Sequence, residues 1–184
     1  RRWLLAAGFL VVGVVVMAGP QHLRERALTM TDPDDVTVKE RIYMWRSGIA
    51  MWREHPWLGV GPGGVKREYR HYAQAEALKK RTGHVHNSAL QILVELGVAG
   101  LLAWLWIWAA FFTEAVRLFR RLPAAAIRER ALVAGSIAAI TGFLIAGMSE
   151  HNFGDSEVVM LAWMIMALPF TVRGARTGGK PDTP

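Results

Sequence analysis

Four apolar stretches separated by polar segments dominate the chain. They cover residues 3–19, 90–112, 131–148 and 158–172. An α-helix rises about 1.5 Å per residue and the hydrocarbon core of a bilayer is about 30 Å thick, so each stretch is near the length that a membrane-crossing helix needs. The pattern predicts an all-α membrane protein with four transmembrane helices, of which the fourth needs flanking residues to reach full length.

These spans set the boundaries of the predicted segments. We expect transmembrane helices at 1–19, 88–112, 131–148 and 158–172, loops at 20–87, 113–130 and 149–157, and a tail at 173–184. A signal peptide with a poor cleavage site at Ala18-Gly19 is the alternative for residues 1–19. The chain opens with Arg1 rather than Met, so we expect it to be a fragment of a longer protein.

The long polar loop contains two predicted amphipathic helices, at about 36–55 and 65–81. Apolar residues three or four positions apart form a stripe on the first: Val38, Ile42, Trp45, Ile49 and Trp52. Thr37-Val38-Lys39-Glu40 matches a capping box at its start, and Pro56 ends it. The apolar side of the second helix carries Val65, Tyr69 and Tyr72. Both helices are suited to lying on a membrane surface.

Small and charged residues within the spans indicate a larger helix bundle. The third span contains Gly135, Ser136, Gly142 and Gly147, and small residues let helices approach closely in lipid. Glu95 is the single charged residue between 90 and 112, and it should face the bundle interior or the lipid headgroups. We therefore expect further helices outside the chain to pack against it.

Composition and charge narrow the class of partner. The chain of 184 residues is 52% hydrophobic, has eight Trp and no Cys, and carries a formal charge of +7. In a soluble protein that charge could indicate nucleic acid, but here the cations flank membrane-sized apolar blocks, so we predict lipid contact and no nucleic-acid partner. The lack of Cys excludes disulfides and thiolate metal sites.

The short loops predict the orientation in the membrane. Loop 113–130 carries five arginines, whereas loop 149–157 carries three acidic residues and no Lys or Arg. Cytoplasmic loops are enriched in Lys and Arg, so loop 113–130 and the tail are expected in the cytoplasm and the loops at 20–87 and 149–157 outside. The long loop is also basic, but loops of its length are weak topology signals.

A polar segment with two histidines, His84-Val85-His86-Asn87-Ser88, leads directly into the second span. Asn87 or Ser88 can cap the helix, because each side chain can accept a hydrogen bond from a free backbone N–H. The partial positive charge of a helix N-terminus favours anions. A histidine there is suited to proton transfer near neutral pH on phosphate-linked substrates at the membrane surface.

The spacing of His86-Asn87, Gly97 and Gly100 resembles the histidine motif of the O-antigen ligase and polymerase superfamily. Arg41, Trp45 and the segment 55–63 resemble the upstream R…W…HPxxGxGxG segment of the same superfamily. The likeness covers about residues 36–110 and weakens toward the end. Its members are bacterial inner-membrane glycosyltransferases that use polyprenyl-diphosphate-linked glycans.

The resemblance implies a mechanism that needs no metal or other cofactor. His86 would deprotonate an acceptor hydroxyl, which attacks the anomeric carbon with inversion, and Arg41 would hold the donor diphosphate together with a cation from outside the chain. The implied partners are the lipid-linked donor, a lipid A core or glycan acceptor, and membrane lipids. The implied location is the inner membrane, multi-pass, with the site facing the periplasm, and the chain alone is expected to be inactive.

Further residues are candidates for supporting roles at this site. Candidate substrate contacts are Arg46, His84 and Asn87, and candidate supporting residues are Glu150, Asp155, Gly61 and Gly63. Arginine suits diphosphate because its planar guanidinium binds phosphate in a bidentate manner. Glu150, Asp155 or Glu157, on the outward side, could orient His86 or contact sugar, and all three could equally be polar residues of a short loop in contact with water.

Two other kinds of site are disfavoured. His84 and His86 could both bind a metal ion in an extended segment, but no third ligand stands at a recognisable spacing, so we predict no metal site. Asp32, Asp34 and Asp35 precede a helix start, where capping and solvation explain them better. Residues 59–64 match GxGxxG, but without a preceding strand they predict a turn rather than a dinucleotide site.

Three alternatives to a ligase remain open. A polymerase of the same superfamily would use a different acceptor, and the sequence does not identify the acceptor. An anion transporter of the bicarbonate type would use the basic outward vestibule without needing a general base. A non-catalytic membrane scaffold is the third.

Overall fold

The computed structural model describes Gln21 and residues 35–177, with side chains as far as Val172. The predicted first span therefore lies outside the described residues. The described helices are α3 (Val36–Glu54), α4 (Gly64–Tyr72), α5 (Ser88–Arg121), α6 (Ile127–Ala146) and α7 (Ser156–Thr177), with a short 3₁₀ turn at Asn152–Gly154. No strand occurs among these residues, which confirms the all-α prediction for this part of the chain. The chain divides into two compact units, Arg1–Tyr43 and Met44–Pro184.

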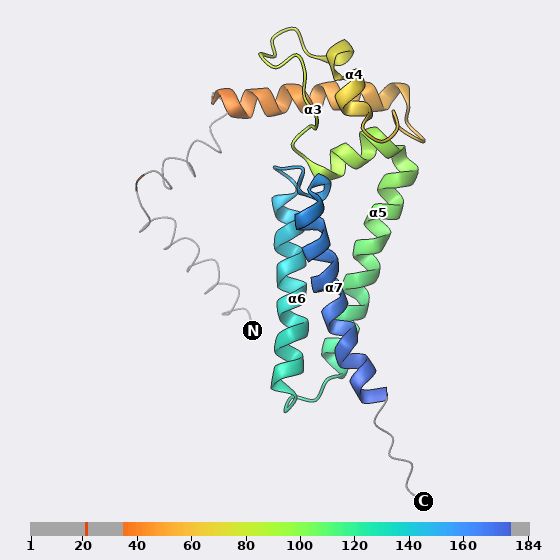
Figure 1. Cartoon of the computed structure of the whole chain (residues 1–184), viewed down its shortest axis with the longest axis vertical. Coiled ribbons are helices and arrows are strands. Elements are labelled where there is room, and N and C mark those ends of the chain that lie inside the picture. Colours follow the sequence, from red (N-terminus) through yellow and green to blue (C-terminus); the bar gives the residue numbers. More distant parts are fainter. Residues whose placement is uncertain (1–20, 22–34, 178–184) are drawn as a thin grey trace, which may run out of the picture. The chain divides into compact units, whose positions relative to one another are not determined.

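Within the second unit, α5, α6 and α7 lie side by side (Figure 1). Their core contains buried apolar side chains from all three helices: Trp108, Phe111, Val133, Ile140 and Ala162. The Trp108 and Trp163 rings stack with their centroids 5.7 Å apart. Aromatic and aliphatic contacts thus join α5 to α6 and α7.

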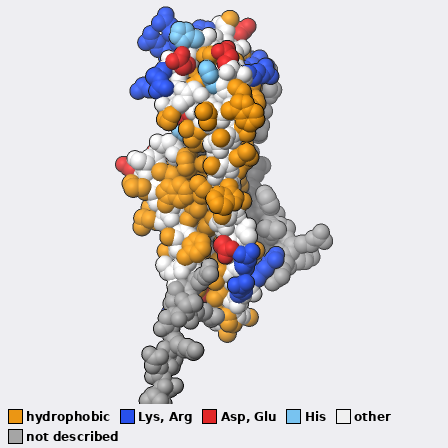
Figure 2. Space-filling model, turned by 90° about the vertical axis from the view of Figure 1, so that its right-hand side faces the viewer, with side chains coloured by type: hydrophobic (Ala, Val, Ile, Leu, Met, Phe, Trp, Pro, Cys, Tyr) orange, Lys and Arg blue, Asp and Glu red, His pale blue; other side chains and the backbone are white. Residues whose placement is uncertain are grey.

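Two described helices, α5 and α6, are long and apolar enough to cross a membrane. A third apolar helix, Ser156–Val172 within α7, is shorter. Hydrophobic side chains gather over the middle of the face shown in Figure 2, with Lys and Arg at the top of the view and a further group of them near its lower end. The arginines near the α5 C-terminus, Arg117, Arg120 and Arg121, are exposed.

The loop predicted at 113–130 is largely helical, because α5 continues to Arg121 and α6 begins at Ile127. Arginines near a helix C-terminus interact favourably with its dipole, so the basic residues extend α5 instead of ending it. Arg130 also donates from Nη1 to the carbonyl oxygens of Phe119 and Leu122, at 3.1 and 3.0 Å. These bonds cap α5 from the first turn of α6.

A break interrupts α5 at Gly97, whose backbone angles are φ 67° and ψ −167°. Only glycine adopts this conformation readily. A Cβ at this position would also lie 2.2 Å from the carbonyl oxygen of Trp57. The helix therefore consists of a short segment before Gly97 and a long apolar segment after it.

The loop after α3 supplies the hydrogen bonds that α5 loses at this break. The backbone N–H groups of Val60 and Gly61 donate to the carbonyl oxygens of Val94 and Glu95, both at 2.9 Å. On the other side, Val98 N–H donates to Pro56 O at 2.9 Å, and Ala99 N–H donates to Trp57 O at 3.3 Å. These hydrogen bonds between the loop and α5 pair the backbone N–H and carbonyl groups around Gly97 that the break would otherwise leave unpaired.

The buried face of the second half of α3 overlaps the predicted stripe only in part. Its buried residues are Met44, Ser47, Gly48 and Met51, and Trp45 and Trp52 of the stripe are partly buried against the same cluster, whereas Ile49 is exposed. A Cβ at Gly48 would meet the side chains of Val94 and Val85 at 3.3 and 3.4 Å. This close approach places Ser47 and Gly48 in the buried face, which a stripe of large apolar residues did not predict.

The second amphipathic helix, α4, ends at Tyr72, well before the predicted boundary at residue 81. Val65 and Tyr69 are fully buried, and Tyr72 and Ala73 pack against the same cluster. The helix ends because Ala73 leaves the helical conformation, with φ −59° and ψ 127°. At the start of α4, Glu95 Oε1 accepts a hydrogen bond from Val65 N–H at 3.4 Å, which suits the positive end of a helix.

Asp35, rather than Thr37, caps the start of α3. Its Oδ1 accepts hydrogen bonds from the N–H groups of Thr37 at 2.7 Å and Val38 at 3.3 Å. The Thr37 bond is the main reason that the pKa of Asp35 lies below its ordinary value. The predicted capping box at Thr37 is wrong because Asp35, two positions earlier, is a strong N-cap residue and starts the helix there.

Candidate active site

The two motif histidines are positioned by the residue between them. Val85 is fully buried; its N–H donates to Gln91 Oε1 and its carbonyl oxygen accepts from Trp45 Nε1, both at 3.0 Å. Successive side chains of an extended segment point to opposite sides, so anchoring Val85 leaves His84 and His86 on the other side. Their ring centroids are 4.4 Å apart.

His86 is the single described non-glycine residue with a positive φ, at 49°. This left-handed conformation is uncommon for a residue with a Cβ, and such residues cluster at functional sites. It turns the chain from the extended histidine segment into the first residue of α5. The helix cap follows at once, since Asn87 Oδ1 accepts from Leu90 N–H at 2.9 Å.

Hydrogen bonds join the start of α5 to the turn after α6. Ser88 N–H donates to Gly147 O at 2.7 Å, and Asn87 Nδ2 donates to Met148 O at 3.0 Å. Ser88 Oγ is also within hydrogen-bond distance of Asn152 Oδ1, at 2.9 Å. These contacts hold together two segments that are about sixty positions apart in the sequence, and they bring Glu150 beside the histidines.

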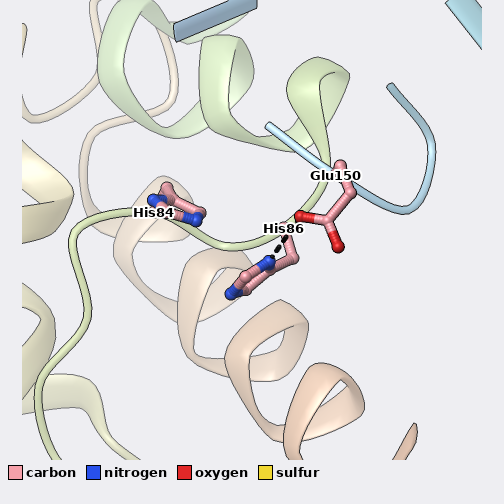
Figure 3. A group of neighbouring side chains, drawn as sticks. All are labelled: His84, His86 and Glu150. Carbon is pink, nitrogen blue, oxygen red and sulfur yellow. Dashed lines mark hydrogen bonds and ion pairs between the residues drawn. The ribbon is translucent and has the colours of Figure 1, made fainter. Parts of the chain in front are cut away.

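Glu150 contacts His86 directly (Figure 3). The distance from His86 Nδ1 to Glu150 Oε2 is 2.9 Å, and the side chains are 24% and 53% exposed. A neutral imidazole has one N–H donor and one lone pair. If Nδ1 donates to the carboxylate, the lone pair of Nε2 is free to accept a proton from another molecule.

A third histidine, His151, belongs to the same cluster, with its ring centroid 5.7 Å from that of His84. The pKa of His151 is lowered, chiefly by burial and then by the charges of His84 and His86. The pKa of His84 is lowered by burial and by the neighbouring His86. Both shifts favour neutral rings around His86, which limits positive charge at the site.

The arrangement can also hold a metal ion. Single ligand atoms from His84, His86 and Glu150 all lie within 4.8 Å of one another. Glu150 is therefore a third potential ligand. Its spacing in the sequence gave no sign of this, because it is distant from the histidines in the sequence and close to them only in the folded chain. The metal-free prediction itself stays a prediction.

The other predicted site residues occupy several parts of the chain. Arg46 is exposed on α3, and Arg41 lies on the same helix in the unit formed by Arg1–Tyr43. Asn87 uses its amide oxygen in the α5 cap and its amide nitrogen in the bond to Met148. Asp155 caps α7, accepting from Glu157 N–H at 3.0 Å. Their roles toward substrate stay predictions.

The two candidate glycines shape the loop that crosses α5. Gly61 and Gly63 have φ values of 84° and 69°, in the left-handed region that favours glycine. Arg67 closes the same turn, donating from Nη1 to Pro62 O at 2.9 Å. These glycines therefore have a demonstrated backbone role.

Sequence reasoning missed Gln91 and His151. Gln91 is 2% exposed and holds Val85, and its signal was a polar residue in the first turn of an otherwise apolar helix. His151 follows Glu150 directly in a short polar loop. No spacing rule connects either residue to the histidine motif, because both act through contacts made by the fold.

A family model described as O-antigen ligase matches residues 1–105. The match includes the histidine segment and the loop that crosses α5, and it ends before Glu150 and His151. No curated protein matches the chain.

Proposed function

The chain belongs to the O-antigen ligase family, and we propose that it is part of a glycosyltransferase that moves a glycan from a polyprenyl-diphosphate carrier to an acceptor hydroxyl. The acceptor would be a lipid A core or a similar molecule at the outer face of the bacterial inner membrane. The family and the apolar helices α5 and α6 support a membrane protein with glycosyltransferase-like function.

The contact between His86 and Glu150 is the observation that carries this proposal. Nδ1–H donates to Glu150 Oε2 across 2.9 Å, and Nε2 takes the proton of the acceptor hydroxyl. The carboxylate orients the ring and stabilises the imidazolium that forms, as a general base requires. Glu150 acts through His86, so it is a positioning residue.

The freed acceptor oxygen then attacks the anomeric carbon of the donor. The bond from that carbon to the diphosphate oxygen breaks, and its electron pair leaves with the diphosphate. Arg41 is proposed to hold this group together with a cation from outside the chain, because guanidinium remains charged and binds phosphate oxygens in pairs. Arg46 is proposed to contact lipid phosphate. Because arginine would neutralise the negative charge of the leaving diphosphate, the reaction would need no metal ion.

A second group of contacts is proposed for the sugar. His84 lies beside His86, with ring centroids 4.4 Å apart, and its neutral ring can exchange hydrogen bonds with hydroxyl groups. The amide of Asn87 already has two partners, so its contact with substrate would use the remaining capacity of those atoms.

Polymerase chemistry would use the same atoms with a growing glycan as the acceptor. An anion transporter, in contrast, has no need for a histidine whose second nitrogen is oriented by a carboxylate. The His86–Glu150 pair therefore favours glycan transfer over transport.

The test is reconstitution of the complete protein in vesicles with a polyprenyl-diphosphate-linked glycan. Lipid A core and unlinked glycan are supplied as separate acceptors, and bicarbonate flux is measured in parallel. Transfer to lipid A core supports a ligase, and extension of the glycan supports a polymerase. Anion flux without glycan transfer would contradict the proposal.

A further inference from the structure

The cluster of His84, His86 and Glu150 has the geometry of a cation site. Its three ligand atoms lie within 4.8 Å of one another, and two separate segments supply them (Figure 3). The bonds from Asn87 and Ser88 to the turn after α6 fix these segments to each other. The ligands are therefore brought together by the fold itself, and small side-chain movements suffice to close around an ion.

The chemistry of these ligands selects the kind of ion. Two imidazole nitrogens and one carboxylate oxygen are typical ligands of Zn²⁺, whereas Ca²⁺ and Mg²⁺ prefer oxygen ligands throughout. Three protein ligands leave one coordination position for water. His84 and His86 can both contribute because Val85, between them, is buried and bonded at both its N–H and its carbonyl.

We propose that His84, His86 and Glu150 bind one Zn²⁺ ion and that the bound ion inhibits glycan transfer. Ligation of Zn²⁺ through His86 Nδ1 uses the lone pair of that nitrogen, so the single proton of the neutral ring moves from Nδ1 to Nε2. Nε2 then carries a proton and cannot accept the one from the hydroxyl. Ligation through Nε2 blocks the same step directly. The inhibition rests on the proposed function, whereas the binding does not.

The binding test uses the complete protein in detergent, stripped of metal and titrated with Zn²⁺ against a chromophoric chelator. The wild type should bind about one ion per chain at this site. Removing a residue that only hydrogen-bonds to a metal ligand typically lowers metal affinity by ~10–100-fold. His84→Ala removes a ligand itself, so it should weaken Zn²⁺ binding by at least about tenfold. Glu150→Gln serves as the second variant, because it keeps the size of the side chain and a hydrogen-bond acceptor.

His71→Ala is the matched control, since His71 is exposed on α4 and outside the cluster. It should bind Zn²⁺ as the wild type does. Equal affinities for the wild type, His84→Ala and Glu150→Gln would overturn the site, as would a lack of Zn²⁺ binding by the wild type.

The transfer assay separates the inference from the proposed function. Metal-free wild type should transfer glycan, and Zn²⁺ should inhibit over the concentration range in which it binds. Transfer that is insensitive to bound Zn²⁺ would overturn the inhibition. Transfer that requires Zn²⁺ would also overturn it, and would replace the general base with a metal-bound nucleophile. Absence of transfer under every condition, with Zn²⁺ binding intact, would contradict the proposed function and leave the binding site standing.

Discussion

The two ring nitrogens of His86 have different roles in the proposed mechanism. Nδ1 contacts Glu150 Oε2 at 2.9 Å, which leaves Nε2 for the acceptor. The positive φ of His86 and the buried neighbour Val85 set the direction of the ring before substrate arrives. A base held in this way needs little rearrangement during the reaction.

Glu150→Gln should lower kcat with little change in KM, because the charge that supports the imidazolium is lost while the substrate contacts are kept. The loss should be smaller than the roughly 10²–10⁴-fold expected for removing the base itself. Steady-state transfer kinetics measure both constants. Glu76→Gln, an exposed change in the loop after α4, is the control. Equal rates for the two variants would remove Glu150 from the mechanism.

Arg41→Lys should cost much of the transfer activity, since a point charge does not replace a guanidinium that binds phosphate oxygens in pairs. Arg53→Lys, an exposed change near the end of the same helix, should have a mild effect. The rates of both variants are compared in the transfer assay. Similar small losses would make Arg41 an ordinary surface cation.

The motif identified His86 from the sequence, but its partners required the fold. Asn87 and Ser88 were both candidate caps, and the structure assigns the cap to Asn87 while Ser88 binds the turn after α6. Glu150 was one of three acidic candidates in its loop, with Asp155 and Glu157. Only the bonds across more than sixty positions distinguish it from Asp155, which caps α7.

The break in α5 explains the glycine spacing at the scale of elements. Gly97 and Gly59 lie where the backbones of α5 and the loop after α3 approach closely, and a Cβ on Gly59 would lie 2.4 Å from the Glu95 carbonyl carbon. The loop replaces the hydrogen bonds that the break removes. The first segment of α5 can therefore turn toward the histidine segment without leaving its backbone groups unpaired.

Gly97→Ala should destabilise the protein, because φ is 67° and the added Cβ would meet the Trp57 carbonyl. Gly83→Ala is the matched control, since Gly83 is exposed in a loop and nothing described lies within 4 Å of a Cβ there. Thermal unfolding in detergent should show a lower Tm for Gly97→Ala and little change for Gly83→Ala. Equal Tm values would contradict the account of the break.

Periodicity predicted the existence of the described helices better than their faces and ends. The helix predicted at about 36–55 corresponds to α3, Val36–Glu54, although Asp35 caps it instead of Thr37. Its buried face was predicted only in part, because Ser47 and Gly48 carry no apolar signal in the sequence. Likewise, the arginines after residue 113 resembled a loop, although they lie in α5 and support its C-terminus.

For the whole molecule, the candidate site and the arginine-rich turn lie at opposite ends of α6. Ser88 contacts Gly147 just after the α6 C-terminus, and Arg130 caps α5 from the first turn of α6. The 20 residues of α6 extend about 30 Å, which matches the hydrocarbon thickness of a bilayer. This separation allows the site and the arginines to face different compartments.

Single cysteines at Lys79 and Arg121 should therefore react with an impermeant thiol reagent from opposite sides of the membrane. The chain has no native Cys, so each labelling site is unique within it. Lys79 should label from the periplasm and Arg121 from the cytoplasm, following the positive-inside rule. Labelling of both from the cytoplasm would remove His86 from any periplasmic reaction.

The central claim is that His86 is the base for glycan transfer, and His86→Ala tests it most directly. Transfer by the complete protein is compared for the wild type, His86→Ala and the exposed control His71→Ala, all with metal removed by chelator. The rate of His86→Ala should fall by about 10²–10⁴-fold, while its membrane insertion and Tm stay close to those of the wild type and His71→Ala transfers normally. Full activity in His86→Ala would contradict the account.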